Sequence, residues 1–169
     1  TNYTPTLTDF SDSNASTYEY FVRAICSDTE KSYWSGPKVF VRNDDASTAL
    51  RILTNSTEIC ETAASKVTFN GATASSDTSS CGGVNSGDIW FEFIATSKVH
   101  IIEANGFTGN FYQSSGDEDY PDMTMTLYQV TDAGLVEKKC SSNNSIVAMY
   151  QSELVVGSIY KVRLTLHAP

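Results

Sequence analysis

Short stretches of alternating apolar and polar residues, separated by turn-forming residues, run through most of this chain and constrain its fold more than any other feature. A period of two puts successive side chains on opposite faces of a β-strand. Residues 123–128, Met-Thr-Met-Thr-Leu-Tyr, follow this period almost without interruption. No segment sustains the 3.6-residue period of a helix, and turn signals return roughly every 8–12 residues, which is typical of a sandwich or barrel. The sequence therefore predicts an all-β protein.

The predicted strands fall into two groups, divided at Asn43-Asp44-Asp45, where the apolar alternation stops and a short acidic linker begins. The first group, residues 17–27 and 38–42, defines a unit of residues 1–42. The second group defines a unit of residues 43–169, with a Ser/Thr/Gly loop from 71 to 87. Its strands are expected near residues 48–54, 66–70, 89–94, 98–103, 123–128, 135–140, 146–150 and 159–166.

Composition narrows the class of protein. Hydrophobic residues make up 40% of the 169 residues and charged residues only 18%, a balance that favours an extracellular all-β protein. The formal net charge of -9 repels polyanions, so nucleic acid is not an expected partner. No apolar run approaches the roughly 20 residues that cross a bilayer, so no membrane span is expected. We expect a secreted or outer cell-surface location, with the export signal outside this segment.

The four cysteines, at positions 26, 60, 81 and 140, lack the spacing of a zinc site. They contain no Cys-x-x-Cys pair, and His100 and His167 are the only possible nitrogen ligands. Disulfides and buried free thiols both remain open. The even count and the polar, acidic composition favour disulfides, which form in oxidising compartments.

Two tyrosines open alternating strands after an upstream apolar residue. Tyr160 follows Leu154 by six residues, and Tyr18 follows Phe10 with a longer loop. In β-sandwiches such a tyrosine can turn its hydroxyl back onto the upstream backbone and pin a strand crossing, which is called a tyrosine corner. The alternative at both positions is a tyrosine that merely begins a strand.

The strand from Tyr18 to Ser27, followed by Tyr33-Trp34-Ser35-Gly36-Pro37 and Val39-Phe40, resembles the last two strands of the fibronectin type III domains of secreted bacterial proteins. Too few residues precede Tyr18 for the earlier strands, so the resemblance implies a partial copy. Arg23 and Trp34 are expected to stack as a cation–π pair worth about 1 kcal/mol. The alternative is that Trp34 covers the edge of a core.

The remainder resembles the bacterial pre-peptidase C-terminal domain, in the form common in proteins exported by the type IX secretion system. The resemblance implies an antiparallel, jelly-roll-like β-sandwich. It rests on the order and spacing of Asn43-Asp44-Asp45, Cys60 with Cys81, Asp88 to Phe93, Pro121-Asp122-Met123 before Leu127-Tyr128, Cys140-Ser141, and Leu154 to Arg163.

The same resemblance sets Cys60, which precedes the Ser/Thr/Gly loop, with Cys81, which lies in it. We predict a disulfide between them, because closing roughly 20 residues contributes about 3 kcal/mol in the chain-entropy model. Cys26 is expected to have no partner in this chain, since the strand that would face it belongs to the missing half of its domain.

An acidic cluster, from Asp117 to Asp122, provides the hard oxygen ligands that calcium requires. We predict a weak Ca²⁺ site, and a solvated acidic turn is the alternative. Its candidate ligands are Asp117, Asp119 and Asp122, with Asp44 and Asp45 as further oxygen donors.

The sequence offers no nucleophile–base pair, no zinc constellation and no phosphate-cradling Gly loop, so we expect no catalytic activity. Trp34 and Tyr112 lie in or beside loops, where an aromatic ring either stacks on a sugar or covers a core edge. With the resemblances, this predicts a non-catalytic binding, adhesion or spacer module of a large bacterial surface protein. Its partner is expected to be an extracellular protein, a glycan or another domain of the parent chain. The alternative is an accessory module of a secreted peptidase or glycoside hydrolase whose catalytic domain lies upstream.

Overall fold

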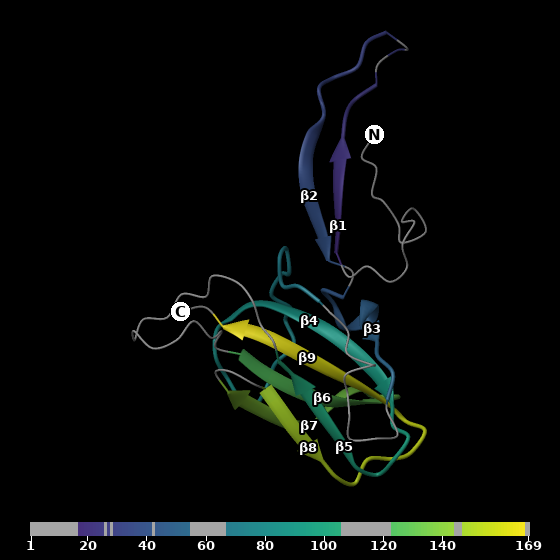
Figure 1. Cartoon of the computed structure of the whole chain (residues 1–169), viewed down its shortest axis with the longest axis vertical. Helices are drawn as coiled ribbons and strands as arrows, with labels where there is room; N and C mark the ends of the chain where they lie inside the picture. The colour runs from purple at the N-terminus through teal and green to yellow at the C-terminus, as the bar shows by residue number, and fades with distance from the viewer. Residues whose placement is uncertain are drawn as a thin grey trace.

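The structure, a computed structural model, describes residues 17–25, 27, 29–41, 43–54, 67–105, 123–143 and 147–167. It is nearly all β, with several sheets, and confirms the predicted all-β sandwich. The elements, labelled in Figure 1, are β1 (Thr17–Val22), β2 (Ser35–Val41), the short helix η2 (Ala46–Thr48), β3 (Leu50–Arg51), β4 (Asn85–Ile94), β5 (His100–Ala104), β6 (Met123–Thr131), β7 (Gly134–Asn143), β8 (Val147–Gln151) and β9 (Ile159–His167).

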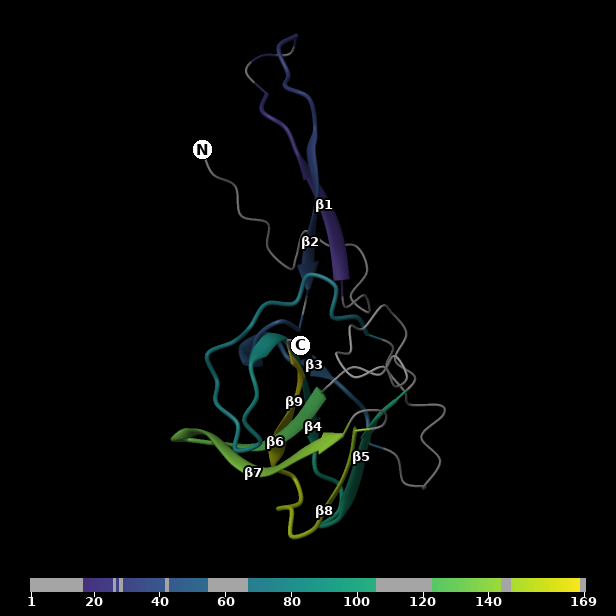
Figure 2. The same cartoon turned by 90° about the vertical axis from the view of Figure 1, so that its left-hand side faces the viewer.

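Five strands form the main sheet, in the order β3-β4-β9-β6-β7. β3 runs parallel to β4, and the other neighbours pair antiparallel. β5 and β8 form a separate two-stranded sheet whose inward side chains, Ile102 and Met149, pack in the core of the main sheet. Figure 2 shows the two layers from the side. The core thus lies between the sheets, as in a sandwich.

The central strands are buried on both faces, and their alternation decides which side chains meet. Ile89, Phe91 and Phe93 of β4 enter the core with every second residue of β9 and β6. Each fully buried apolar side chain of this kind contributes about 1.5–3 kcal/mol. The intervening residues form a second, polar layer on the opposite face, and it consists of Asp88, Trp90, Thr124, Thr126, Tyr128, Arg163 and Thr165.

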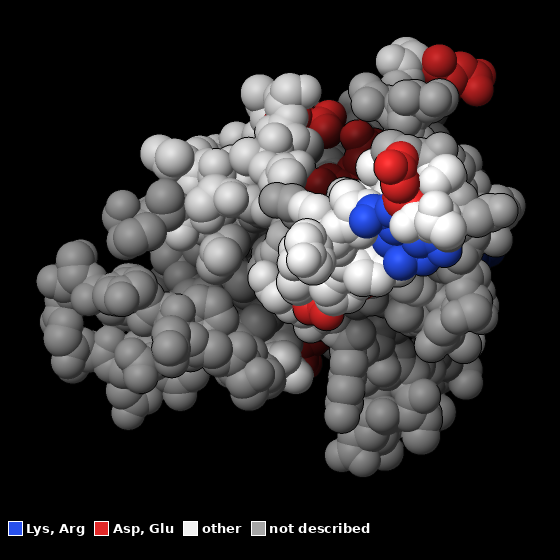
Figure 3. Space-filling model, turned by 90° about the horizontal axis from the view of Figure 1, so that it is seen from above, with Lys and Arg blue, Asp and Glu red and all other residues white. Residues whose placement is uncertain are grey.

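A β1–β2 hairpin projects from the sandwich (Figure 1). Its last residue, Val41, is buried and belongs to the core of the sandwich. From there the chain pairs with β4, because the carbonyl of Asn43 accepts a hydrogen bond from the Trp90 amide at 2.7 Å. Viewed from the hairpin end of the molecule, basic and acidic side chains lie together (Figure 3).

Of the two alternatives for Tyr160, the structure shows the tyrosine corner. Tyr160 is fully buried at the start of β9, and its Oη accepts a hydrogen bond from the backbone N–H of Val155 at 2.9 Å. Leu154 beside it packs in the core. The hydroxyl therefore pins the chain where it crosses into β9. For Tyr18, the expected upstream residue Phe10 lies outside the described residues.

Some predicted strand boundaries are wrong. The strand expected through residue 27 ends at Val22, and beyond it Ile25 and Lys31 form only an isolated bridge. Residues 67–70 form no strand, although Val67 and Phe69 pack against the core. Apolar alternation shows which side chains are buried, but a strand also needs a neighbouring backbone to pair with.

Candidate functional site

The polar layer of the main sheet is built around a buried ion pair. Asp88 is 0% exposed and Arg163 is 2% exposed. The Nε and Nη2 of Arg163 donate to Oδ2 of Asp88 at 2.6 and 2.5 Å. The guanidinium also lies 5.6 Å from the ring centroid of Trp90, and Trp90 packs against Tyr128 with 5.5 Å between ring centroids. Two buried charges are tolerated here because each is paired and hydrogen-bonded.

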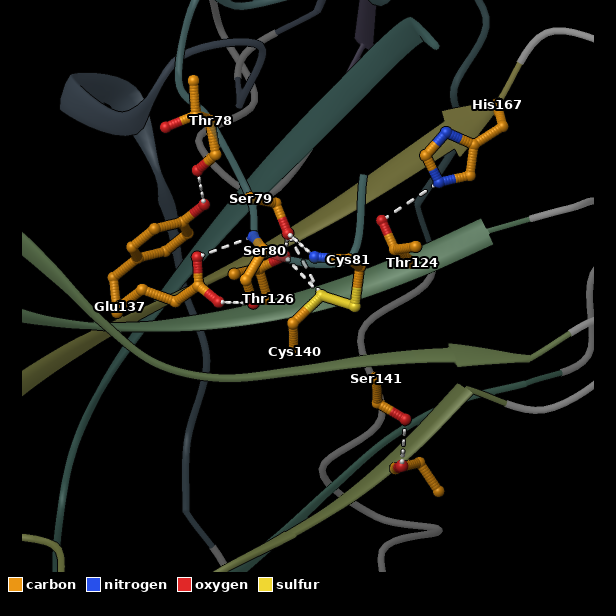
Figure 4. Close-up of a disulfide and its surroundings, with 12 residues drawn as sticks. Thr78, Ser79, Ser80, Cys81, Thr124, Thr126, Glu137, Cys140, Ser141 and His167 are labelled. Atoms are coloured by element: carbon orange, nitrogen blue, oxygen red, sulfur yellow. Dashed lines mark hydrogen bonds between the residues drawn. A yellow bond between two sulfur atoms is a disulfide. The ribbon is translucent and has the colours of Figure 1, made fainter. Parts of the chain in front are cut away.

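Residues 72–84, which we call the strap, cover this layer and are attached by polar groups rather than by apolar packing. Arg163 Nη1 donates to the carbonyl of Asp77 at 2.6 Å. The Tyr128 hydroxyl donates to the carbonyl of Thr78 at 2.8 Å, and burial raises the pKa of Tyr128. The hydroxyls of Ser79 and Thr126 lie 2.9 Å apart (Figure 4). These bonds hold the strap to side chains from two central strands of the sheet, β6 and β9.

A disulfide closes the end of the strap, and its partner differs from the predicted one. Cys81 is bonded to Cys140 of β7, with a Cα–Cα distance of 5.8 Å (Figure 4), so the predicted Cys60–Cys81 pair is wrong. The strap folds back across the sheet and meets a strand 59 residues later in the chain, a proximity that flanking a loop does not reveal. Cys26 and Cys60 lie outside the described residues.

Glu137, beside Cys140 on β7, reinforces this end of the strap. Its Oε2 accepts a hydrogen bond from the backbone N–H of Ser80 at 3.0 Å, and its Oε1 accepts one from the Ser80 hydroxyl. Glu137 lies outside every motif of the sequence, and Tyr128 and Arg163 belong to motifs that gave them no role in holding a loop. The only signal was their position on the solvent-facing side of alternating strands, which gives no hint that a loop covers them.

The acidic linker ties three parts of the sandwich together. The Nδ2 of Asn43 donates to the carbonyl of Trp90 at 3.1 Å. Asp44 accepts hydrogen bonds from the backbone and hydroxyl of Thr73 at 2.6 and 2.7 Å. Asp45 caps η2 by accepting from the N–H of Ser47 at 2.7 Å, and this bond lowers the pKa of Asp45. The carboxylates of Asp44 and Asp45 therefore have structural roles.

The calcium prediction stays a prediction. Asp117, Asp119 and Asp122 lie outside the described residues, so their distance to Asp44 and Asp45 is not defined. Within the part of the chain that the structure describes, no group of three or more His, Cys, Asp or Glu side chains is arranged to hold a metal ion.

The two histidines are both engaged by nearby groups. The Nε2 of His100 accepts hydrogen bonds from the backbone N–H groups of Thr96 and Ser97, both at 3.2 Å, and burial lowers the pKa of His100. The Nε2 of His167 lies 3.2 Å from the hydroxyl of Thr124. Thr124 is buried on the face of the main sheet that the strap covers. A substrate cannot reach that hydroxyl without displacing its cover.

The hairpin carries a second candidate site, a group of large apolar side chains that remain exposed. We call it the hairpin patch, and it comprises Phe21, Val22, Ile25, Tyr33 and Trp34. Tyr33 is 98% exposed and Trp34 59% exposed, so Trp34 does not cover a core. The guanidinium of Arg23 lies 4.5 Å from the centroid of the Trp34 ring, which confirms the predicted cation–π pair. Tyr112, the other predicted stacking residue, lies outside the described residues.

None of the helices in the described residues is long and apolar enough to cross a membrane. Comparison of the chain with protein-family models, curated proteins and solved structures gave no significant match.

Proposed function

We propose that this chain is a non-catalytic binding module and that the hairpin patch is its contact surface. The carrying observation is that Phe21 and Val22, adjacent at the end of β1 where its register with β2 shifts, are both about half exposed. A two-stranded ribbon is only marginally stable alone, and exposed apolar patches mark interaction sites. Such a hairpin is suited to pairing with the sheet of another protein or domain.

The charge distribution also favours the hairpin as the contact surface. Residues 17–41 contain three acidic residues (Glu19, Asp28 and Glu30) and three basic residues (Arg23, Lys31 and Lys38), so the segment is neutral in a chain with a net charge of -9. Two acidic molecules repel each other least where their surfaces are neutral. Association through the hairpin should therefore strengthen, rather than weaken, as salt screens the remaining charge.

The proposed setting is a large secreted or cell-surface bacterial protein. The Cys81–Cys140 disulfide supports an oxidising compartment. The resemblance to fibronectin type III strands and to the pre-peptidase C-terminal domain supports a module beside other domains. The partner is then an extracellular protein, with the parent chain's own domains as the nearest source of complementary strands.

A second copy of the chain is the simplest probe of this surface. Sedimentation from micromolar to millimolar concentration should show self-association that Phe21→Ser combined with Trp34→Ser abolishes. Val155→Ser combined with Val156→Ser is the matched control, because both valines are also about half exposed but lie in the turn before β9, away from the hairpin. The control should associate like the parent chain.

Three outcomes would count against the proposal. The first is a chain that stays monomeric at every concentration, and the second is association that survives the hairpin substitutions. The third is a catalytic activity on a peptide or glycoside, provided that this activity co-purifies with the chain through successive columns. A glycan array read with the same variants separates sugar binding from protein pairing, since binding that survives loss of Trp34 would place the sugar site elsewhere.

A further inference from the structure

The buried polar layer contains atoms that the protein does not satisfy. Oδ1 of Asp88, Nε1 of Trp90 and Oγ1 of Thr165 are all buried and have no hydrogen-bond partner among the described residues. Buried polar atoms in folded proteins are almost always paired with protein or with ordered water, because leaving them unpaired costs stability. Their grouping on one face of β4 and β9 indicates a site rather than three unrelated defects.

Asp88 and Thr165 face each other across the sheet. They are register partners in the antiparallel pairing of β4 with β9, so their side chains leave the sheet on the same face. The Cβ atoms of such partners lie about 4.5–5.5 Å apart. Their side-chain oxygens thus lie on the same face of neighbouring strands, and Oδ1 of Asp88 and Oγ1 of Thr165 are hydrogen-bonded neither to each other nor to another described group.

The other oxygen of Asp88 already has a full set of donors. Arg163 donates to it twice, the Ser75 hydroxyl donates at 2.7 Å and Asn85 Nδ2 donates at 2.9 Å. Arg163 also neutralises the carboxylate, which disfavours a metal cation. The carboxylate itself repels an anion, and an apolar molecule would leave both oxygens unpaired. The molecule that fits is neutral, small and both donor and acceptor.

We propose that Asp88 and Thr165 bind an internal water molecule beneath the strap. The water donates to Oδ1 of Asp88 and accepts from the hydroxyl of Thr165. Ser75 of the strap and Asn85 of β4 both donate hydrogen bonds to the Asp88 carboxylate. Asn85 also donates to the Ser75 carbonyl at 3.3 Å. The water therefore completes the hydrogen bonding of Asp88, the residue to which Ser75 attaches the strap.

High-resolution crystal structures of the full chain and two variants test this site. Thr165→Val removes the hydroxyl at nearly constant volume, whereas Thr165→Ser keeps it. An ordered water within hydrogen-bond distance of both Asp88 Oδ1 and residue 165 is expected in the parent chain and in Thr165→Ser. It should be absent in Thr165→Val, whose melting temperature should fall by roughly 2–6 °C for a chain of this size.

The contrary results are equally specific. A direct hydrogen bond between Thr165 and Asp88, with no density between them, would overturn the proposal, and so would a metal ion at that position. An unchanged melting temperature of Thr165→Val would do the same. If Thr165→Val does not fold, the parent chain and Thr165→Ser still decide whether the water is present.

Discussion

Arg163 shows how much of this protein's architecture can depend on one side chain. It neutralises Asp88, donates to the strap at Asp77 and lies over Trp90, all while buried. A buried ion pair adds little net stability compared with well-packed apolar residues. Removing only one of the two charged side chains is costly, because the other charge then stays buried without compensation.

Replacing Arg163 should therefore be far more damaging than replacing an exposed arginine. We expect Arg163→Met to lower the free energy of unfolding by about 3–5 kcal/mol, since Asp88 stays buried and unpaired. Arg51→Met is the control, because the Arg51 side chain is 56% exposed and its Nη1 lies 3.9 Å from Oε1 of Glu92. A pair of this kind near the surface is worth about 0–1 kcal/mol. Urea denaturation measures both. Equal losses in the two variants would show that burial of the pair is not what matters.

His100 should make stability depend on pH in a defined direction. Burial lowers its pKa in the folded protein, and only neutral His100 can accept the two backbone hydrogen bonds. The unfolded chain therefore binds a proton first, near pH 6.5. The contribution of His100 is complete above that pH and is lost as pH falls through the folded pKa. Urea midpoints of the chain and of His100→Gln should converge between pH 7.5 and 5, and divergence would contradict the assignment.

Among the larger elements, the strap differs from the strands in how it is held. The apolar core lies on the other face of the main sheet, and of the strap only Ala72 packs against it. The strap depends instead on hydrogen bonds and on the Cys81–Cys140 disulfide. Exposing a polar layer to water costs less than exposing an apolar one. The strap is therefore the cover that should open before the sandwich unfolds.

Reduction of the disulfide should release the strap without unfolding the sheet. The 59-residue separation corresponds to about 4 kcal/mol of chain entropy in the loop-closure model. Hydrogen–deuterium exchange should rise in residues 73–84 after reduction, whereas β4, β6 and β9 stay protected. A Cys81→Ser, Cys140→Ser variant treated with the same reductant should show no further change. Uniform loss of protection would mean instead that the disulfide holds the whole sandwich together.

Across the whole molecule, the hairpin and the sandwich depend on each other at one point. β1 and β2 contact each other extensively and make no comparable contact with the other described elements. Val41 and the linker after it, however, are built into the sandwich. The functional surface that we propose can thus vary without disturbing the core.

Two truncations separate these contributions. A chain of residues 40–169 should melt within a few degrees of the full chain, because it keeps Val41 and the linker. A chain of residues 46–169 should lose roughly 2–4 kcal/mol, since it lacks a buried valine and the bonds of Asn43 and Asp44. Calorimetry of both measures the difference. If the two chains melt together, the linker is not part of the sandwich.

Local pattern was enough to predict the all-β class, the alternation of β6 and the Arg23–Trp34 stack, and it marked Tyr160 as a candidate for a corner. Each depends on residues near one another along the strands or across one turn, where period-two alternation decides the direction of side chains. The Asp88–Arg163 pair depends on the register of β4 with β9. The Cys81–Cys140 pair and the Asp44–Thr73 bonds depend on the path of the strap, an irregular segment with no periodicity. Its position is set by contacts between residues up to 86 apart in the chain, and these contacts form only once the sheet exists to receive it.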